Sequence, residues 1–292
     1  MLGRFRITAA ARAAHTAAYA AFEAEDWPLA GHQLAAAAAM LPAGRAQRAA
    51  WFDAALAYKF ARDWARAYEH GRTAASLVER GKEEPAFWNL GIAATMLREW
   101  DTARDAWAGY GLRLPAGTGE ITEDLGPTCV RIETGGGQEV VWAIRICPTR
   151  ARIVNVPFRP SRRYGEVVLH DGVPNGERVS GGRTVPVFDE IALFTPSDLA
   201  TLTVDADAPE QADVEALADL FAQERYGMEM PSTRRDLCAC CSESTVRQER
   251  VIPVGRQQFL LAAPLDRARE LLDRWRAERP GERSWENLHP AT

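Results

Sequence analysis

The chain has 292 residues and a formal net charge of −5, so it carries no overall attraction to nucleic acid or to an anionic membrane. Hydrophobic residues make up 47% and charged residues 26% of the sequence, which is ordinary for a globular protein, and five cysteines are too few for a disulfide scaffold. No run of about 18 apolar residues occurs, so we expect no membrane segment and a cytoplasmic protein.

The first 115 residues contain 34 alanines and a repeated pair, an acidic residue followed by tryptophan. The pairs are Asp26-Trp27, Asp63-Trp64 and Glu99-Trp100. The tryptophans lie 37 and 36 positions apart, a period typical of stacked helical hairpins, and small alanine side chains let paired helices approach closely. The pattern predicts three helix pairs, at 8–24 with 28–41, 47–61 with 65–80, and 85–97 with 101–113.

Aligning the copies on tryptophan brings further positions into register, most fully in the third copy, at Leu90, Gly91, Ala103, Trp107 and Pro115. This spacing resembles the tetratricopeptide repeat (TPR), although Ala94 stands at the motif's usual tyrosine and Tyr110 at its second small position. The resemblance covers residues 11–115. It implies that residues 1–115 form a solenoid of three helical hairpins, in which the first helix of each pair lines a concave groove.

The side chains expected on this concave face are mostly apolar or aromatic. They are Tyr19, Phe22, Phe52, Leu56, Lys59, Trp88, Ile92 and Thr95. An exposed surface of this kind usually marks a contact site, so we expect a groove that binds a protein partner. The alternative occupant is the C-terminal half of the same chain, and the sequence does not decide between the two.

Residues 116–119 have the composition of a linker, and after them glycine and β-branched residues replace alanine. Short alternating stretches follow at 128–133, 139–147, 152–156, 166–170, 183–188, 191–194 and 199–204. Glycine-containing turns separate them, which predicts a mainly antiparallel sandwich or open barrel. Apolar spacing predicts helices at 209–227 and 264–279 with a strand at 256–262 between them, followed by an irregular tail at 280–292.

The expected fold class is therefore a TPR-like helical solenoid followed by a mainly antiparallel, β-rich α+β domain at 120–279. The segment from Leu125 to Gly172 also resembles a domain that follows TPR repeats in uncharacterised bacterial proteins. That resemblance implies no particular activity.

A cysteine cluster contains the most distinctive local motif. Cys238 and Cys241 have the C-x-x-C spacing of half a zinc site. The two further ligands would have to come from distant residues such as Cys129, Cys147 or His170. The alternative is a set of small buried thiols, which is the commoner environment of free cysteine.

Charge is separated along the C-terminal half. Residues 145–183 carry eight arginines against three acids, whereas residues 189–243 carry thirteen acids against three arginines. The first segment includes a basic patch at Arg159, Arg162 and Arg163, and arginine suits the recognition of carboxylate or phosphate groups. Few aromatic residues accompany these arginines, so we favour pairing of the two segments, or solvated faces, over nucleic-acid binding.

The sequence contains no recognised catalytic motif, and Asp171-Gly172 is better explained as a turn than His170-Asp171 is as an acid–base pair. The leading hypothesis is a non-enzymatic protein that binds a protein partner, as an adaptor or as an immunity protein that neutralises a toxin. The alternatives are an enzyme or metal-dependent protein with an unfamiliar site around His170, Asp171 and the cysteine cluster, and a scaffold that oligomerises.

Overall fold

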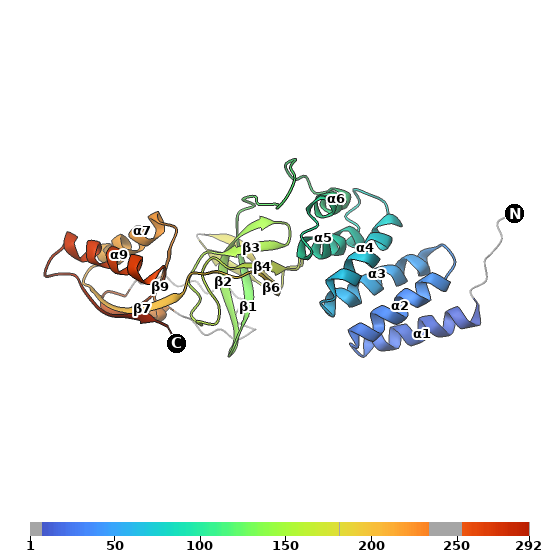
Figure 1. Cartoon of the computed structure of the whole chain (residues 1–292), viewed down its shortest axis with the longest axis horizontal. Coiled ribbons are helices and arrows are strands. Elements are labelled where there is room, and N and C mark those ends of the chain that lie inside the picture. The colour runs from blue at the N-terminus through green and yellow to red at the C-terminus, as the bar shows by residue number, and fades with distance from the viewer. Residues whose placement is uncertain (1–7, 181, 234–252, 292) are drawn as a thin grey trace. The chain divides into compact units, whose positions relative to one another are not determined.

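The computed structural model describes residues 8–180, 182–233 and 253–291, and the chain divides into two compact units, Met1–Ile121 (unit 1) and Thr122–Thr292 (unit 2). Unit 1 is helical and unit 2 combines β-sheets with helices (Figure 1), which confirms the expected fold class. The described helices include none whose length and apolar character would let it cross a lipid bilayer.

Unit 1 has six helices among its described residues, and each one packs against the helix that follows it (Figure 1). They are α1 (Ala9–Glu23), α2 (Trp27–Met40), α3 (Arg45–Phe60), α4 (Trp64–Ser76), α5 (Pro85–Met96) and α6 (Trp100–Tyr110). This is the arrangement of stacked helical repeats, in which neighbouring hairpins bury one another's apolar faces.

The turn between the two helices of a hairpin has the same backbone conformation in all three hairpins. Its residues are Glu25-Asp26-Trp27, Arg62-Asp63-Trp64 and Arg98-Glu99-Trp100, and the first residue is left-handed in each, with φ of 58°, 57° and 60°. The backbone N–H of each acidic residue donates to the carbonyl five positions earlier, at 3.1, 2.9 and 2.9 Å, which is the long bond of a Schellman motif. The period of 36 to 37 residues therefore marks the end of one helix followed directly by the start of the next.

The acidic residue and the tryptophan have separate roles in this turn. The Asp26 carboxylate accepts a hydrogen bond from the Leu29 backbone N–H at 3.3 Å, and Asp63 caps its own helix in the same way. The Trp27 ring lies against Phe60, at the end of the next hairpin's first helix, with 4.8 Å between ring centres. This tryptophan therefore joins two successive hairpins.

Small residues let the helices of unit 1 approach closely, as their composition predicts. A Cβ atom at Gly91 of α5 would lie 2.4 Å from the ring of Trp107 on α6, a side chain with no exposed surface. At Gly71 of α4, the nearest atom to a Cβ would be 3.5 Å away, on Leu90, which is an ordinary contact. At Gly91 the neighbouring helix therefore leaves no room for a Cβ atom, whereas at Gly71 there is room for one.

The first half of unit 2 is a small barrel. Its strands are β1 (Pro127–Thr134), β2 (Gly137–Cys147), β3 (Arg150–Ile153), β4 (Val167–His170), β5 (Glu177–Ser180) and β6 (Arg183–Thr195). Neighbours in the order β1-β2-β3-β4-β6 are antiparallel, and β6 also pairs in parallel with β1, so this sheet closes on itself while β5 extends it as a hairpin. Apolar side chains form its core: Val130, Ile132, Val141, Ala143, Ala151, Ile153 and Val168.

The second half of unit 2 is a four-stranded sheet with helices, which we call the αβ half. Its elements are β7 (Thr201–Ala208), α7 (Gln211–Gln223), β8 (Gly227–Glu229), η1 (Pro231–Thr233), β9 (Gly255–Ala262), α9 (Leu265–Glu278) and β10 (Ser284–Pro290). The strand order is β10-β7-β9-β8 with antiparallel neighbours. A βαββαβ chain with this order is the split-βαβ arrangement of ferredoxin-like folds. Leu217, Phe221 and Trp275 of the two helices pack with Val204 and Phe259 of the sheet in one core.

The αβ half differs from the sequence prediction at its end. The segment 280–292 was expected to be irregular, but β10 forms there and pairs with β7. Its side chains Trp285 and Leu288 pack against the core of the sheet and helices. These two side chains are three residues apart because the strand has a bulge between Glu286 and His289. The bulge breaks the alternation of apolar and polar residues by which a strand is normally recognised in a sequence.

Apolar contacts join the two halves of unit 2. Val156, with Phe158 and Tyr164, extends from the loop between β3 and β4 and packs against Leu260 and Ala262 of β9. The barrel loop therefore covers part of the sheet face that the helices leave open.

Candidate functional site

The predicted groove residues lie on α1, α3 and α5, and their exposure differs along the row. Tyr19 and Phe22 on α1 and Phe52 and Leu56 on α3 are half-buried, as is Trp88 on α5. These five apolar or aromatic side chains are the accessible part of the predicted groove, and we call them the groove residues below.

The other three predicted groove positions are buried. Ile92 and Thr95 on α5 have no exposed surface, and Lys59 on α3 is 5% exposed. A buried side chain cannot contact a partner without a change in the fold, so the accessible surface is concentrated on the first two hairpins. Helical periodicity placed all eight positions on first helices, but it does not report how deeply each of these helices is covered.

Two polar contacts connect the first helices of successive hairpins. The Tyr19 hydroxyl donates to the Asp53 carboxylate, between α1 and α3. The Lys59 ammonium donates to the Asn89 side-chain oxygen at 3.1 Å, between α3 and α5. Burial raises the pKa of the Asp53 carboxyl, and this outweighs the opposing effects of the Tyr19 hydrogen bond and of nearby His15. The groove residues therefore lie beside polar groups that are already fixed to one another.

The predicted basic patch separates into one buried and two exposed arginines. Arg162 is 8% exposed and makes ion pairs with Glu166 at 2.8 Å and Glu190 at 2.6 Å, whereas Arg159 and Arg163 are exposed. Burial alone would lower the pKa of the Arg162 guanidinium, but the hydrogen bonds to the two glutamates raise it. Arg162 is therefore neutralised within the barrel and does not offer its charge to a partner.

His170 and Asp171 do not face each other as an acid–base pair. The His170 ring is fully buried and stacked on Phe188, with 4.6 Å between ring centres. Its Nδ1 lies 2.7 Å from the Asp171 backbone carbonyl, which can only accept, so Nδ1 carries the proton of the neutral ring. Burial, together with the Arg145 charge, lowers the pKa of His170 to about 4 despite the opposing carbonyl bond. The Asp171 carboxylate instead accepts from the Gly172 N–H at 2.7 Å, as in the predicted turn.

The cysteine motif at Cys238 and Cys241 lies outside the described residues. Cys129 and Cys147 are free thiols buried in unit 2, and burial raises the pKa of Cys129 to about 11, so its reactive thiolate is disfavoured. Within residues 8–180, 182–233 and 253–291, no group of three or more His, Cys, Asp or Glu side chains is placed to hold a metal ion.

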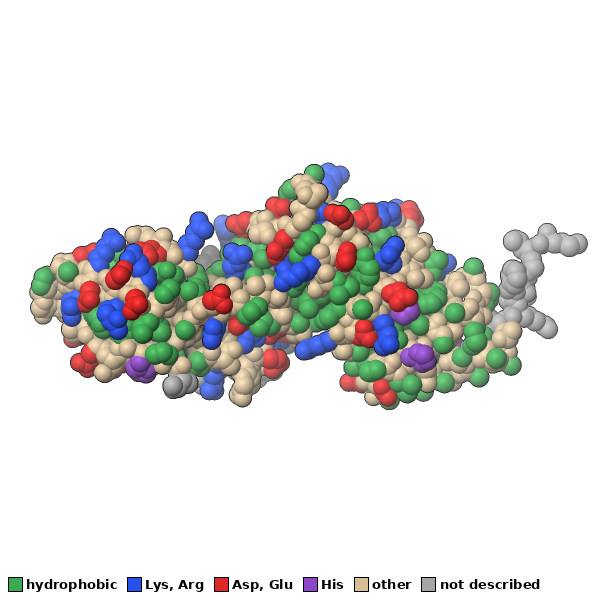
Figure 2. Space-filling view, viewed as in Figure 1, with side chains coloured by type: hydrophobic (Ala, Val, Ile, Leu, Met, Phe, Trp, Pro, Cys, Tyr) green, Lys and Arg blue, Asp and Glu red, His purple; other side chains and the backbone are tan. Residues whose placement is uncertain are grey.

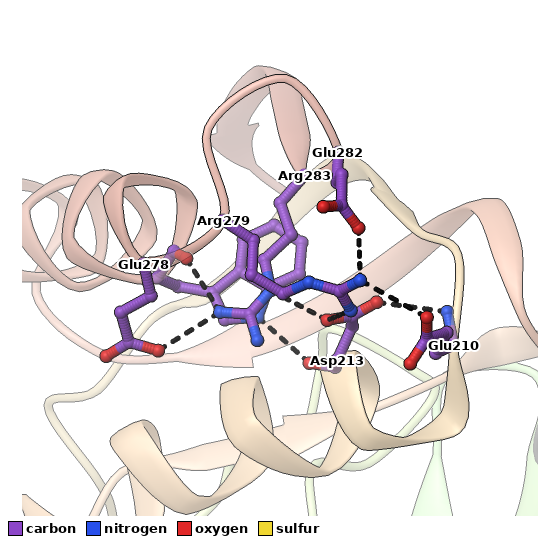
Figure 3. Close-up of polar contacts among 7 residues, drawn as sticks. Glu210, Asp213, Glu278, Arg279, Glu282 and Arg283 are labelled. Carbon is purple, nitrogen blue, oxygen red and sulfur yellow. Dashed lines mark hydrogen bonds and ion pairs between the residues drawn. The ribbon is translucent and has the colours of Figure 1, made fainter.

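Figure 3 shows a polar cluster that the sequence analysis did not predict. Asp213 of α7 has no exposed surface and accepts from Arg279 Nη1 and Arg283 Nε, each at 2.8 Å. The Glu210 backbone N–H adds a bond at 3.0 Å to the same carboxylate. Burial favours the neutral form of Asp213, but the two arginines outweigh it and hold the pKa of its carboxyl below the ordinary value.

This cluster joins segments that are far apart in the chain (Figure 3). Arg279 follows α9 and Arg283 precedes β10, 66 and 70 residues after Asp213. Arg283 also donates to the Trp275 carbonyl at 2.8 Å, and the Trp275 indole N–H donates to the Asp213 carbonyl at 2.9 Å. These bonds fix the segment that leads into β10. The sequence carries only a local signal, the capping box of Glu210 and Asp213, and no local pattern reveals the distant arginines.

The charge separation along the sequence does not produce separate charged faces in the αβ half. Figure 2 shows acidic and basic side chains interspersed there. Arg267 of α9 pairs with Glu224, and Arg279, which follows α9, pairs with Glu210 at 3.2 Å. The acidic segment therefore lies beside arginines contributed by later elements, in particular α9.

No family model, no curated protein and no solved structure matches this chain. The geometry of its two units is therefore the basis for a functional conclusion.

Proposed function

We propose that this protein is a non-enzymatic protein–protein interaction protein, in which a TPR-type solenoid binds a partner through the groove residues of unit 1. The supporting observation is the half-buried aromatic and apolar set Tyr19, Phe22, Phe52, Leu56 and Trp88, displayed along the first helices of a repeated scaffold. Aromatic side chains with partial exposure on rigid elements are the usual anchors of protein interfaces.

The scaffold suits this role because it holds the anchors at fixed spacing. Tyr19 is tied to Asp53 and Lys59 to Asn89, so the row of first helices is connected by polar bonds as well as by packing. Unit 1 therefore loses little conformational freedom when a partner fills the groove, and this favours affinity. An adaptor and a toxin-neutralising immunity protein both fit this description, and the exposed arginines Arg159 and Arg163 offer a second contact for an acidic partner.

Site-specific photo-crosslinking in the source cells tests the groove directly. A photoreactive phenylalanine analogue replaces Leu56, which is half-buried on α3, and a second protein carries the analogue at Met40, which is 49% exposed on α2. We expect a discrete crosslinked species from position 56 that is absent from position 40.

A paired substitution supplies the control. Phe52→Ser with Leu56→Ser removes two groove residues, and Leu29→Ser with Met40→Ser removes two exposed side chains of α2. The first pair should abolish capture of the crosslinked species in a pull-down while the second leaves it intact, both with unchanged helical circular dichroism. If the folded groove variant captures the species as well as the unmodified protein does, the groove is not the binding site.

A further inference from the structure

The outer face of α1 is unoccupied by any other described element of unit 1. Six side chains of this face line a shallow hollow that is open to solvent: Ala9, Arg12, Ala13, Thr16, Ala17 and Ala20. All six are exposed, whereas Ala11, Ala18 and Ala21 on the other side of the helix are buried. In Figure 2, the part of unit 1 that holds α1 and α2 carries mostly hydrophobic side chains and backbone. A solenoid end normally carries a polar face, and an apolar helix face of this kind is suited to contact with another helix.

The repeat itself shows what covers this kind of face. Adding 37 to the four alanine positions of α1 gives four alanines of α3, at Ala46, Ala50, Ala54 and Ala57. That face of α3 holds a helix, because its alanines pack against Ala30, Leu34, Ala38 and Leu41 on and beside α2. One repeat later, the equivalent Ala86, Leu90 and Ala93 of α5 are also buried, and Ala67 and Ala75 of α4 pack against them. The same face therefore receives a helix twice within this chain.

The charges of α1 identify the orientation that a second α1 would take. Arg12 and Glu23 are eleven residues apart, which is close to three helical turns, so they project from the same flank of the helix about 16 Å from each other. In an antiparallel pair related by a twofold axis, each flank faces the same flank of the other helix. Arg12 of one copy then lies beside Glu23 of the other. In a parallel pair with its twofold axis along the helices, this flank would face the other flank of the partner, and the two charges would not meet.

We propose that the α1 face is the contact surface of a homodimer, in which α1 of a second copy packs antiparallel over the alanine hollow. Small side chains let the two helix backbones approach closely, as α2 and α3 do within the chain. One helix pair covers less area than a stable dimer interface needs, so the association is reversible and depends on concentration. Of the groove residues, Phe52, Leu56 and Trp88 lie on α3 and α5, outside this contact.

Sedimentation velocity of the full chain from about 1 µM to about 1 mM measures the association over the range in which small interfaces form. We expect the weight-average sedimentation coefficient to rise from the monomer value toward the dimer value. Ala13→Arg places a bulky charge in the hollow and should keep the protein monomeric, with an unchanged circular dichroism spectrum because Ala13 is exposed. Ala36→Arg, at an exposed alanine of α2, is the matched control and should dimerise normally.

A charge swap tests the antiparallel geometry separately. Arg12→Glu places a glutamate beside Glu23 of the other copy at each end of the helix pair. This repulsion should raise the dimer dissociation constant about tenfold or more. Adding Glu23→Arg restores opposite charges across the twofold axis, so the double variant should regain the dissociation constant of the unmodified protein. A protein that is monomeric at every concentration overturns the proposal, and so does a dimer that Ala13→Arg leaves intact or that the double variant fails to restore.

Discussion

In each hairpin of unit 1, the residue directly before the N-cap of the second helix adopts a backbone conformation that side chains disfavour. Glu25, Arg62 and Arg98 all have φ near 60°, where the Cβ of an L-residue approaches the following carbonyl. Glycine is the usual residue at such a helix end because it has no Cβ. The repeat uses charged residues instead, so each turn carries a small, identifiable conformational cost.

We therefore expect Arg62→Gly to stabilise the protein. Removing the Cβ relieves about 1 kcal/mol of strain, and the greater freedom of glycine in the unfolded chain offsets part of it, leaving a net gain of about 0.5 kcal/mol. Urea denaturation measures the change. Arg62→Ala is the control because it removes the same exposed side chain but keeps the Cβ, so equal stability of the two variants would contradict the explanation.

His170 makes the stability of the fold depend on pH. Its pKa is lowered from the ordinary 6.5 to about 4 in the folded chain, so the unfolded chain binds the proton more tightly. The stabilising effect is complete above pH 6.5 and is lost as the pH falls toward 4, with a maximum of about 3 kcal/mol from this one residue.

Denaturation midpoints at neutral pH and near pH 4.5 test this dependence. His170→Asn keeps an N–H that can donate to the Asp171 carbonyl but does not titrate, so the variant should lose less stability between the two pH values. An identical loss in both proteins would assign the acid sensitivity to other groups.

At the scale of elements, the helices of unit 1 are spaced by individual small residues. Gly91→Ala would place a Cβ 2.4 Å from the buried Trp107 ring, and we expect a loss of about 1–3 kcal/mol from overpacking. Gly71→Ala meets Leu90 at an ordinary 3.5 Å, so the higher helix propensity of alanine should dominate and stabilise the helix by up to about 1 kcal/mol. Thermal melts of the two variants should shift in opposite directions, and a shift in the same direction would refute this account of the spacing.

The elements of the αβ half are joined by the Asp213 cluster. Asp213→Ala leaves Arg283, whose side chain is 6% exposed, without its buried carboxylate, and we expect a loss of about 3–5 kcal/mol. Asp273→Ala removes one partner of an exposed ion pair on α9 and should change stability by no more than about 0.5 kcal/mol. Guanidinium denaturation measures the free energy of unfolding of both variants. Similar losses of stability would show that burial does not determine how much the Asp213 ion pairs contribute to stability.

At the scale of the whole molecule, β10 completes the sheet order of the αβ half. A chain that ends at residue 279 lacks Arg283 and the core side chains Trp285 and Leu288, and leaves β7 as an outer strand. We expect rapid hydrogen exchange across β7 in this truncated protein. A chain that ends at residue 290 keeps all of β10 and should exchange as slowly as the full chain. Equal protection of β7 in both would mean that the sheet does not need its fourth strand.

The sequence predicts those features of the molecule that repeat or alternate locally. The tryptophan period located all three hairpins, because each Trp begins a helix directly after a capped turn. Strand alternation likewise located most of the barrel. The closure of β1 on β6, the Asp213 cluster and β10 depend on residues more than 55 positions apart, or on a bulge, and no local pattern encodes them.

The candidate site follows the same division. Helical periodicity identifies which side chains of α1, α3 and α5 project from first helices, but burial of Ile92 and Thr95 depends on everything that packs around α5. The pairing of Arg162 with Glu190, from different strands or loops of the barrel, likewise turned an apparent basic patch into an internal ion pair. Charge read along a sequence does not show which distant opposite charge will lie beside a given residue.

The parallel pairing of β1 with β6 joins the barrel strands that lie farthest apart in the chain. Each antiparallel neighbour in β1-β2-β3-β4 can form from nearby chain, but Cys129 and Val187 meet only after the chain between them is in place. Closing so long a loop costs entropy that the new contacts repay only once β6 has docked. We therefore expect the barrel to close late in folding, and until it closes its incomplete sheet has two open edge strands that can pair with another chain.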